Sequence, residues 1–473
     1  MTGKRKRKLA MPDTLIIVAS VVLLVAILSW IIPSGTYDYQ EMNINGRIRN
    51  VAIDGTYHTI DKSEVTTTGF LGFFSVLYRG CVEAADVIFM ILCCCGTFGV
   101  VVKTGAFHAG IGTILKKLKG KEILLVPIIM MIFGLGGSVF GMASEFYGFY
   151  PLIVGLGVAL GYDAMFGFAI IAVGEFVGFM GATLNPYSVG IAQTISGVEL
   201  YSGTGYRAIC FVIFMAISII YVMVYGRKIK KNPGASVVFG EKNIHAFDRD
   251  ELNEYSFTLK DGLVLLDVLV VLVVLMLGLI KWGWDFPQLC GLFLLMSMIA
   301  AAICKWSPNK WCSEFIDSAK TAMWGCILTG IAKAITVVMQ DAQIMDTVIY
   351  GLSNVLKNAP HAVSAQVMLV VQTLINFFIP SATGQASATM PIMAQLADII
   401  GVSRQTAVLA FQFGDGLSNI FWPTADIVII CGLGGISLQK WYKWFTPLFL
   451  ILFVTQAILL GIATGVGLWS AFD

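Results

Sequence analysis

The chain has 473 residues, of which 57% are hydrophobic and only 13% are charged, about half the ~25% charged fraction of average soluble domains. The mean hydropathy is +0.81, and apolar runs of about 20 residues, enough to cross a bilayer, recur from end to end. These values exclude a soluble globular protein. The net charge of +2 excludes no partner by itself, so the placement of Lys and Arg must be considered.

The apolar runs predict two kinds of membrane segment. A basic KRKRK run at 4–8 precedes the first apolar run, which is too long for the core of a signal peptide. Four other apolar regions are interrupted or rich in Gly, Pro and Asn, so we predict two re-entrant hairpins at 122–160 and 364–400 and two broken spans at 164–195 and 403–440. Continuous spans are predicted near 14–32, 84–106, 207–226, 262–282, 286–304, 317–340 and 446–468.

Polar segments and charge fix the expected topology. Segment 33–83 contains Asn45-Gly46 and Asp54-Gly55 turns between alternating runs, the pattern of a small β-meander outside the membrane. The polar segment 227–260 is predicted to be a cytoplasmic linker. Because cytoplasmic loops carry excess Lys and Arg, we place the N-terminus in the cytoplasm and the C-terminus outside. The bacterial cytoplasmic membrane is the expected location, and the expected divisions are 1–32, 33–83, 84–226, 227–260, 261–304 and 317–468.

The two halves of the chain resemble each other. Stretches that start at Pro151 and Pro391 follow an interrupted apolar region, and each leads through a glycine, Gly161 or Gly401, into a broken span. The first half begins inside and the second outside, an arrangement known from secondary transporters. We therefore predict an all-α polytopic membrane protein built as an inverted-topology repeat, with two re-entrant helical hairpins and two broken transmembrane helices.

Polar residues inside these four segments are the candidate site. Intramembrane polar groups are costly and usually functional. A broken helix exposes N–H groups that suit a carboxylate and carbonyls that suit a cation. The alternative is that these side chains only join helices, with the acids paired to a base such as Lys333. The candidate binding residues are Ala143, Ser144, Glu145, Glu175, Asn185, Pro186, Ser188, Ser381, Thr383, Gly384, Gln385, Asp415, Ser418, Asn419 and Thr424, with a candidate Na⁺ position near Asn185, Asn419 and Asp426.

Other chemistries are disfavoured. Most of the ten cysteines lie in apolar spans and lack zinc-ligand spacing, so neither a disulfide framework nor a zinc site is expected. Walker A, GxSxG and HExxH sequences are missing from the chain, which disfavours ATP-driven transport and the common hydrolases. We expect no enzyme activity, no cofactor beyond a coupling Na⁺ or H⁺, and no nucleic-acid partner; the partners expected are a small-molecule substrate, membrane lipids and a second copy of the chain.

Five stretches of the sequence carry a family resemblance: MPDTL at 11–15, GGSVFGMASE at 136–145, NPYSVGIAQ at 185–193, SATGQASATMP at 381–391 and LAFQFGDGLSNIFWPT at 409–424. These stretches resemble the YfcC-like members of the DcuC (C4-dicarboxylate anaerobic carrier) family of the ion transporter superfamily. The resemblance implies a secondary carrier that works as a homodimer by an elevator motion; family members include C4-dicarboxylate carriers and arginine/ornithine exchangers.

One departure bears on the substrate. Related dicarboxylate carriers have Ser-Asn-Thr at each hairpin tip, ten residues before a proline. This chain has Ser381, Ala382 and Thr383 at the second tip, and Gly-Met-Ala at 141–143 of the first, with Glu145 beside it. Because a carboxylate there suits a cation, we expect an amino-acid carrier or exchanger, for arginine or ornithine. The alternatives are a C4-dicarboxylate carrier coupled to Na⁺ or H⁺, and a channel or membrane enzyme.

The elevator motion predicts a division of the chain. Polar breaks concentrate in 122–200 and 364–440, which we expect to move together. The near-continuous apolar spans are expected to form a static dimer scaffold. Those spans are 14–32, 207–226, 262–304 and 446–468.

Overall fold

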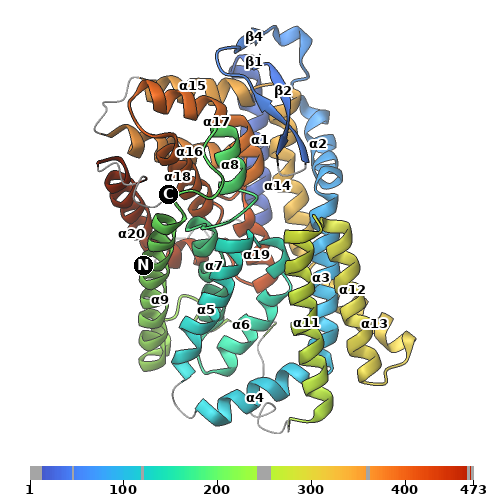
Figure 1. The fold of residues 1–473 in the computed structure, drawn as a ribbon. Helices are drawn as coiled ribbons and strands as arrows, with labels where there is room; N and C mark the ends of the chain where they lie inside the picture. The colour runs from blue at the N-terminus through green and yellow to red at the C-terminus, as the bar shows by residue number, and fades with distance from the viewer. Residues whose placement is uncertain are drawn as a thin grey trace, which may run out of the picture.

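The computed structural model describes residues 13–44, 47–118, 122–241, 245, 257–357, 363–465 and 469. The KRKRK run and the Asn45-Gly46 turn lie outside these residues. Figure 1 shows an elongated bundle of helices with a small β structure at one end. The first half contains α1 (Thr14–Ile31), α2 (Phe70–Glu83), α3 (Ala85–Lys103), α4 (Ala106–Leu118), α5 (Leu125–Leu135), the π-helical turn η3 (Gly136–Phe140), the 3₁₀ turn η4 (Ser144–Phe146), α6 (Phe149–Ala159), α7 (Ala164–Met180), α8 (Val189–Ser196) and α9 (Thr204–Lys231).

The second half has the corresponding kinds of element. Its helices are α11 (Leu259–Lys281), α12 (Phe286–Ile303), α13 (Pro308–Lys320), α14 (Met323–Asp341), α15 (Met345–Lys357), α16 (Ser364–Phe378), α17 (Ala382–Ile399), α18 (Arg404–Ser418), α19 (Asp426–Gly434) and α20 (Leu438–Gly465).

Seven of the described helices are long and apolar enough to cross a membrane: α1, α3, α9, α11, α12, α14 and α20. These are the seven continuous spans that the sequence predicts, so the polytopic helical fold is confirmed. Short helices were missed. The predicted loop 33–83 ends in α2, and α4, α13 and α15 are not predicted, because an amphipathic helix of about 13 residues has no run of apolar residues to mark it.

The helices form two groups, which we name the scaffold group and the hairpin group. The scaffold group comprises α1, α2, α3, α11, α12, α13 and α14, with α14 packed on α1, α2 and α3, and α12 and α13 packed on α3. The hairpin group comprises α5 to α9 and α16 to α20. By packing, α9 lies on α5 and α7, and α20 on α16 and α18, so both are placed in the hairpin group here, whereas the sequence pattern predicts them in the static scaffold. Which helices move stays a prediction.

The β structure outside the bundle differs from the expected meander. Strands β1 (Ser34–Thr36) and β4 (His58–Ile60) pair with each other, and β2 (Tyr39–Ile44) pairs with β3 (Arg47–Ala52), both antiparallel. The paired strands β2 and β3 therefore lie, along the chain, between the two strands of a separate antiparallel ladder, β1 and β4. The Asp346 carboxylate of α15 fixes this unit, because it accepts hydrogen bonds from the Tyr39 hydroxyl at 2.8 Å and the Tyr37 amide at 3.0 Å. On its other side, β3 packs against α17.

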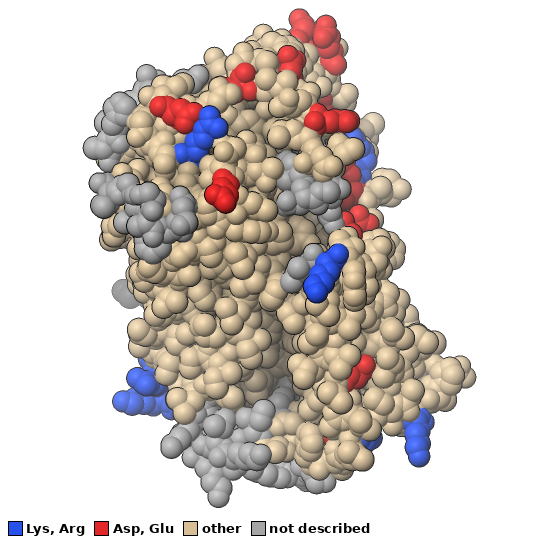
Figure 2. All heavy atoms as spheres, viewed as in Figure 1, with Lys and Arg blue, Asp and Glu red and all other residues tan. Residues whose placement is uncertain are grey.

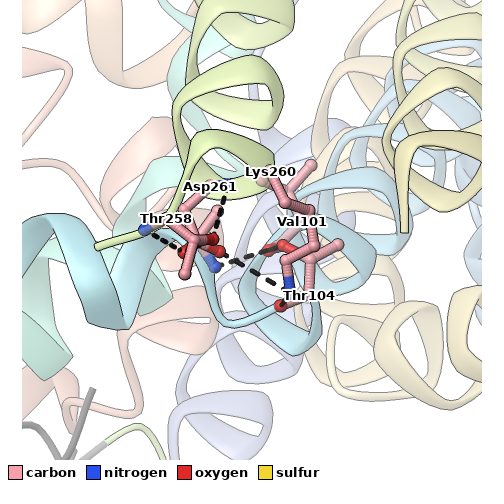
Figure 3. Close-up of polar contacts among 6 residues, drawn as sticks. Val101, Thr104, Thr258, Lys260 and Asp261 are labelled. Carbon is pink, nitrogen blue, oxygen red and sulfur yellow. Dashed lines mark hydrogen bonds and ion pairs between the residues drawn. The ribbon is translucent and has the colours of Figure 1, made fainter. Parts of the chain in front are cut away.

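A capping box stabilises the N-terminus of α11, a helix of the scaffold group (Figure 3). The Thr258 amide donates to Asp261 Oδ2 at 2.9 Å, and the Asp261 amide donates to the Thr258 hydroxyl at 3.4 Å. The Lys260 ammonium lies 3.5 Å from the Thr104 carbonyl at the end of α3. A cation there is favourable because the C-terminus of a helix carries partial negative charge.

Charged side chains gather toward the two ends of the molecule on the face in Figure 2, and few lie in the broad belt between them. Arg227, Lys228 and Lys230 belong to the last turns of α9, at the end of the bundle where α4 lies (Figure 1). An uncharged belt is the surface expected of a protein whose middle faces lipid.

Candidate substrate-binding site

The two hairpins come from opposite ends of the bundle. Figure 1 shows α5 and α6 extending from the end where α4 lies, and α16 and α17 from the end where α15 lies. Each hairpin packs on a broken span: α5 and α6 on α7, and α16 and α17 on α18. The hairpins also cross over, because α6 packs on α19 and α17 packs on α8. Four segments distant in sequence therefore converge at the middle of the hairpin group.

Glycines allow this close packing. A Cβ at Gly137 would lie 2.5 Å from the Glu175 carbonyl oxygen and 2.9 Å from the Phe179 amide nitrogen. A Cβ at Gly178 would overlap the Gly134 carbonyl oxygen, and one at Gly416 would overlap the Met180 backbone. The helix backbones thus lie closer together than any larger side chain at these positions would allow, as is common between membrane helices. All residues of α7 are buried.

The two broken spans begin and end alike. Gly161 and Gly401, at φ of +80° and +71°, precede them. The side chain at each N-cap then accepts a hydrogen bond from a backbone amide: Asp163 from Phe166 and Ser403 from Thr406. The second halves, α8 and α19, end at glycines with φ of +66° and +64°. These matching signals support the repeat that the sequence predicts.

The first break lies between α7 and α8 and is held by local hydrogen bonds. Asn185 Oδ1 accepts from the amides of Tyr187 at 2.9 Å and Ser188 at 3.2 Å. This is the turn that an Asn side chain favours in place of helix. The Ser138 hydroxyl in the π-helical turn donates to the Gly181 carbonyl at 3.0 Å. Hairpin one and the first broken span therefore share their polar groups.

The second break is preceded by a buried amide and carboxylate cluster. Asn376 Nδ2, on α16, lies 2.9 Å from Asp415 Oδ1, 3.1 Å from Asn419 Oδ1 and 3.1 Å from Gln385 Oε1. The exposed fraction of Asp415 is 0%. Among the described residues, Asp415 Oδ2 has no hydrogen-bond partner. A carboxylate oxygen without a donor is costly at this depth, which marks it as the place for a donor or cation.

Two tyrosines of hairpin one contact two further carboxyls, the buried one of Glu175 and the partly buried one of Asp426. The Tyr147 hydroxyl donates to Asp426 Oδ1 at 2.7 Å, and the Tyr150 hydroxyl donates to Glu175 Oε2 at 2.8 Å. Asp426 begins α19, where the helix N-terminus favours a negative charge. Hairpin one therefore contacts both broken spans through charge-assisted hydrogen bonds.

Hairpin two contacts the first break through a hydrogen bond. The Thr383 hydroxyl donates to the Tyr187 carbonyl at 3.0 Å. Ser381 is the N-cap of α17, and its hydroxyl accepts from the Gly384 amide at 3.4 Å. The Glu145 carboxylate, beside the tip of hairpin one, accepts from the Ala143 amide at 3.0 Å and lies 3.5 Å from the Ser144 hydroxyl.

The structure thus brings candidate residues from all four segments into one region, in several kinds of setting. Asn185, Ser381 and Gly384 shape the backbone at a break or tip. Thr383, Asn419 and Glu175 form hydrogen bonds between segments, whereas Gln385 bonds Asn376 and Gln372 within hairpin two. The side-chain oxygens of Ser188 and Thr424 are buried and lack hydrogen-bond partners among the described residues. Ser418 bonds the Gly414 carbonyl of its own helix. Pro186 supports the first break, and Lys333 forms no ion pair with the buried acids within the described chain.

Sequence reasoning missed two central residues. Asn376 links Asp415, Asn419 and Gln385, yet it lies before the tip in the apolar first arm of the predicted hairpin 364–400, outside the polar stretch from which the candidates come. Arg207 lies in the first turn of α9, has an exposed fraction of 1% and donates to the Thr183 carbonyl in the first break. The available signal was the same in both cases: a strongly polar residue inside an apolar segment.

The described residues contain seven apolar helices long enough to cross a membrane and a buried polar centre formed by two hairpins and two broken helices. These are the features of a membrane transporter. The chain belongs to the family described as "DcuC: C4-dicarboxylate anaerobic carrier", which it matches over residues 11–465.

Relatives agree with this class. The chain is 32% identical to "Putative basic amino acid antiporter YfcC" of Escherichia coli over 96% of this chain and 97% of that protein. It is 28% identical to an uncharacterized protein of Haemophilus influenzae over 97% of this chain and 98% of that protein. The description of the family and the name of the Escherichia coli relative are those of transporters.

Two solved structures match the chain over most of its length. The YdaH transporter of Alcanivorax borkumensis has 15% sequence identity and a TM-score of 0.44, covering 96% of this chain and 99% of that one. MtrF of Neisseria gonorrhoeae, described as illuminating a class of antimetabolite efflux pumps, has 16% identity and a TM-score of 0.44, covering 97% of both chains.

Proposed function

We propose that this chain is a secondary carrier that exchanges cationic amino acids, arginine or ornithine, across the bacterial cytoplasmic membrane. The observation that carries the proposal is the Asp415 carboxylate. It is fully buried, it lies at the end of α18 beside the second break, and its Oδ2 atom has no donor among the described residues. A guanidinium or ammonium group would supply that donor and the compensating charge.

The surrounding residues suit the rest of an amino acid. Amide groups of Asn376, Asn419 and Gln385 provide donors and acceptors around Asp415. Ser188 and Thr424 offer buried hydroxyls without partners in the described chain. A substrate carboxylate would take hydroxyl and backbone donors at the breaks. The name of the Escherichia coli relative supports the same substrate class.

A C4-dicarboxylate is the second candidate, favoured by the description of the family. Three buried carboxyls, those of Glu145, Glu175 and Asp415, and the partly buried carboxyl of Asp426 oppose it, since a dianion among them would be repelled unless a coupling cation accompanied it. The Ser-Asn-Thr pattern expected at the hairpin tips of dicarboxylate carriers is also incomplete in this chain. The substrate experiment below compares the two classes directly.

We further propose an elevator motion in which the hairpin group moves against the scaffold group. The hairpins would re-enter the membrane from opposite faces, and the scaffold groups of two copies would form a homodimer. The end of the bundle with the α9 lysines would face the cytoplasm, which places the β structure and the C-terminus outside. The division into two packed groups joined mainly through α14 and α19 supports this motion.

Counterflow in proteoliposomes tests the substrate. Vesicles loaded with unlabelled arginine, ornithine or succinate are given each labelled compound outside. We expect arginine and ornithine to exchange and succinate to remain outside. Asp415→Asn should weaken arginine by roughly 30-fold, since about 2 kcal/mol is lost when a buried charge loses its partner. Exchange of succinate alone, or unchanged arginine affinity in folded Asp415→Asn, would refute the proposal.

A crosslink tests the motion. A Cβ at Gly432, on α19, would lie 3.3 Å from the Cα of Gly325 on α14, so the two groups are in direct contact here and cysteines at these positions are the pair chosen for the crosslink. In a background with the native cysteines replaced by alanine, oxidation of the pair should stop exchange and reduction should restore it. The single variants are the controls. Full exchange in the crosslinked protein would rule out relative motion of α14 and α19.

A further inference from the structure

A crevice of about 220 Å³ lies between the β structure and the hairpin group, and we name it the β crevice. Its β wall is formed by β2, β3 and the turn after β3, and its hairpin wall by α8, α17 and the start of α18. These elements lie at the same end of the bundle, and β3 and α8 both pack on α17 (Figure 1). Pockets for drug-sized ligands measure ~300–1,000 Å³, so the β crevice suits a smaller metabolite.

The strand pairing decides which side chains face the β crevice. Successive residues of a strand point to opposite faces. Gln40 and Met42 of β2 line the crevice, so Glu41 between them faces away from it. Gln40 pairs with Val51 of β3, which also lines the crevice. The β wall is therefore one regular face of the paired strands.

Each wall contributes one charged side chain. On the hairpin wall, Arg404 Nε and Nη2 donate to the Asp398 carboxylate at 3.1 and 2.7 Å, and Nη1 donates to the Ser196 carbonyl at 2.8 Å. These contacts fix the guanidinium and leave one N–H on each Nη atom for a ligand. On the β wall, the Asp54 carboxylate forms no ion pair within the described part of the chain.

The remaining lining suits methylene groups. Met42, Ile195 and Pro391 are half-buried apolar residues of the β crevice. An amino acid with a long cationic side chain has matching chemistry: its carboxylate would accept from Arg404, and its ammonium or guanidinium would donate to Asp54. A dicarboxylate would have no group for Asp54.

The two walls belong to different helix groups. The Ser34 hydroxyl donates to the Ala342 carbonyl at 2.6 Å, and the Gly35 amide donates to the Gln343 carbonyl at 2.9 Å. Both carbonyls directly follow α14, so the β structure is bonded to the scaffold group. A ligand that contacts both walls binds best while they face each other, and it therefore favours that arrangement over any other.

We propose that the β crevice is a second binding site for a cationic amino acid, separate from the buried centre, and that its occupation holds the hairpin group against the β structure. The choice of ligand and the motion rest on the proposed function. Because the proposed orientation places the β structure outside, this site responds to the external concentration and slows exchange when that concentration is high.

Protection of a cysteine from labelling tests the site directly. In the background without native cysteines, Gln395→Cys places a thiol at the hairpin wall, and Glu41→Cys places one on the opposite face of β2 as the matched control. A maleimide is applied to the purified protein with arginine, agmatine or succinate. Agmatine keeps the guanidinium but lacks the carboxylate, and succinate lacks a cation. Labelling does not depend on exchange.

We expect arginine to slow labelling of Gln395→Cys at least about fivefold and that of Glu41→Cys not at all, while agmatine and succinate protect neither. Adding Asp54→Asn or Arg404→Gln should raise the half-protecting arginine concentration roughly tenfold, since a charge-assisted contact becomes neutral. Asp398→Asn removes the internal partner of the guanidinium but keeps the guanidinium itself, so arginine should protect at least as well as without this change.

Three results would overturn the second site: no protection by arginine, equal protection by agmatine, or protection that survives Asp54→Asn and is lost in Asp415→Asn, since that last pattern traces it to the buried centre. Counterflow separates the two proposals. Arginine that exchanges without protecting Gln395→Cys refutes the second site alone, and arginine that protects without exchanging refutes the substrate assignment alone.

The effect on motion has its own measurement. The rate of arginine exchange in wild type should fall about twofold or more as external arginine rises well above the concentration that saturates exchange, because the β crevice then fills. Asp54→Asn should lack this fall, and Glu41→Gln should retain it. A wild-type rate that stays level while arginine protects Gln395→Cys would refute the coupling between the site and the motion.

Discussion

Tyr150→Phe should destabilise the protein through one hydrogen bond at the centre of the hairpin group. The Tyr150 hydroxyl lies 2.8 Å from Glu175 Oε2, and both residues have an exposed fraction of 0%. Glu175 Oε1 has no partner among the described residues. Removal of the hydroxyl therefore leaves a buried carboxyl without the one donor assigned to it, which costs about 2–3 kcal/mol. Tyr78→Phe, at a residue with an exposed fraction of 72%, is the control.

The assay is thermal unfolding of purified protein at one scan rate, since membrane proteins often unfold irreversibly. We expect Tyr150→Phe to lower the apparent Tm by roughly 4 °C or more and the control to leave it unchanged. Loss of both polar partners costs less than loss of one. Tyr150→Phe combined with Glu175→Met should therefore unfold at a higher temperature than Tyr150→Phe alone. A single variant within about 1 °C of wild type, or a double variant that sums two independent losses, would refute the reasoning.

Three further predictions concern packing, the β structure and pH. Gly178→Ala should lower stability by about 2 kcal/mol or more, because its Cβ overlaps the Gly134 carbonyl, while Gly291→Ala, with open space around it, should not; equal unfolding temperatures would contradict the close packing of α5 on α7. Asp346→Asn should expose the β structure to limited proteolysis, because it weakens the bonds from Tyr37 and Tyr39; cleavage at the wild-type rate would argue against that anchor. The hydrogen bond from Arg404 lowers the pKa of the Asp398 carboxyl, so the pair stabilises the fold above the usual Asp pKa of about 4, and its contribution is lost as the pH falls through the folded-state value. Because both groups are exposed, wild type and Asp398→Asn should differ by about 0.5 kcal/mol or less at pH 7 and converge below the folded-state pKa. A gap that widens toward low pH would contradict the sign.

The fold was largely predictable because its signals are local. Seven spans follow from apolar length, and Gly161 and Gly401 mark equivalent turns by their positive φ. The breaks were visible as Asn and Pro inside apolar runs. The pairing of β1 with β4 was not, because turn residues indicate neighbouring strands and cannot show which distant strand closes a ladder.

The sequence predicts which four segments meet, but it does not predict which side chains contact each other. The sequence indicates that residues near 185, 383, 415 and 419 meet, and the Thr383–Tyr187 and Asn376–Asn419 contacts join these segments. It does not indicate that Tyr147 would bond Asp426, since that contact joins the two repeats across 279 residues. Nor does it place α9 and α20, whose apolar surfaces are compatible equally with lipid, scaffold or hairpin group.

The β structure is a suitable epitope for antibody fragments. One side is bonded to α15 through Asp346, and β3 on the other side lies against α17 of hairpin two. A rigid binder raised against this soluble, folded epitope would touch both the anchor and the neighbouring hairpin. If the hairpin moves during exchange, its spacing from the anchor changes, so such a binder would select one conformer. Binders whose affinity differs with and without substrate would then report the conformation of the protein. They would also enlarge the particle for electron microscopy of a chain of only 473 residues.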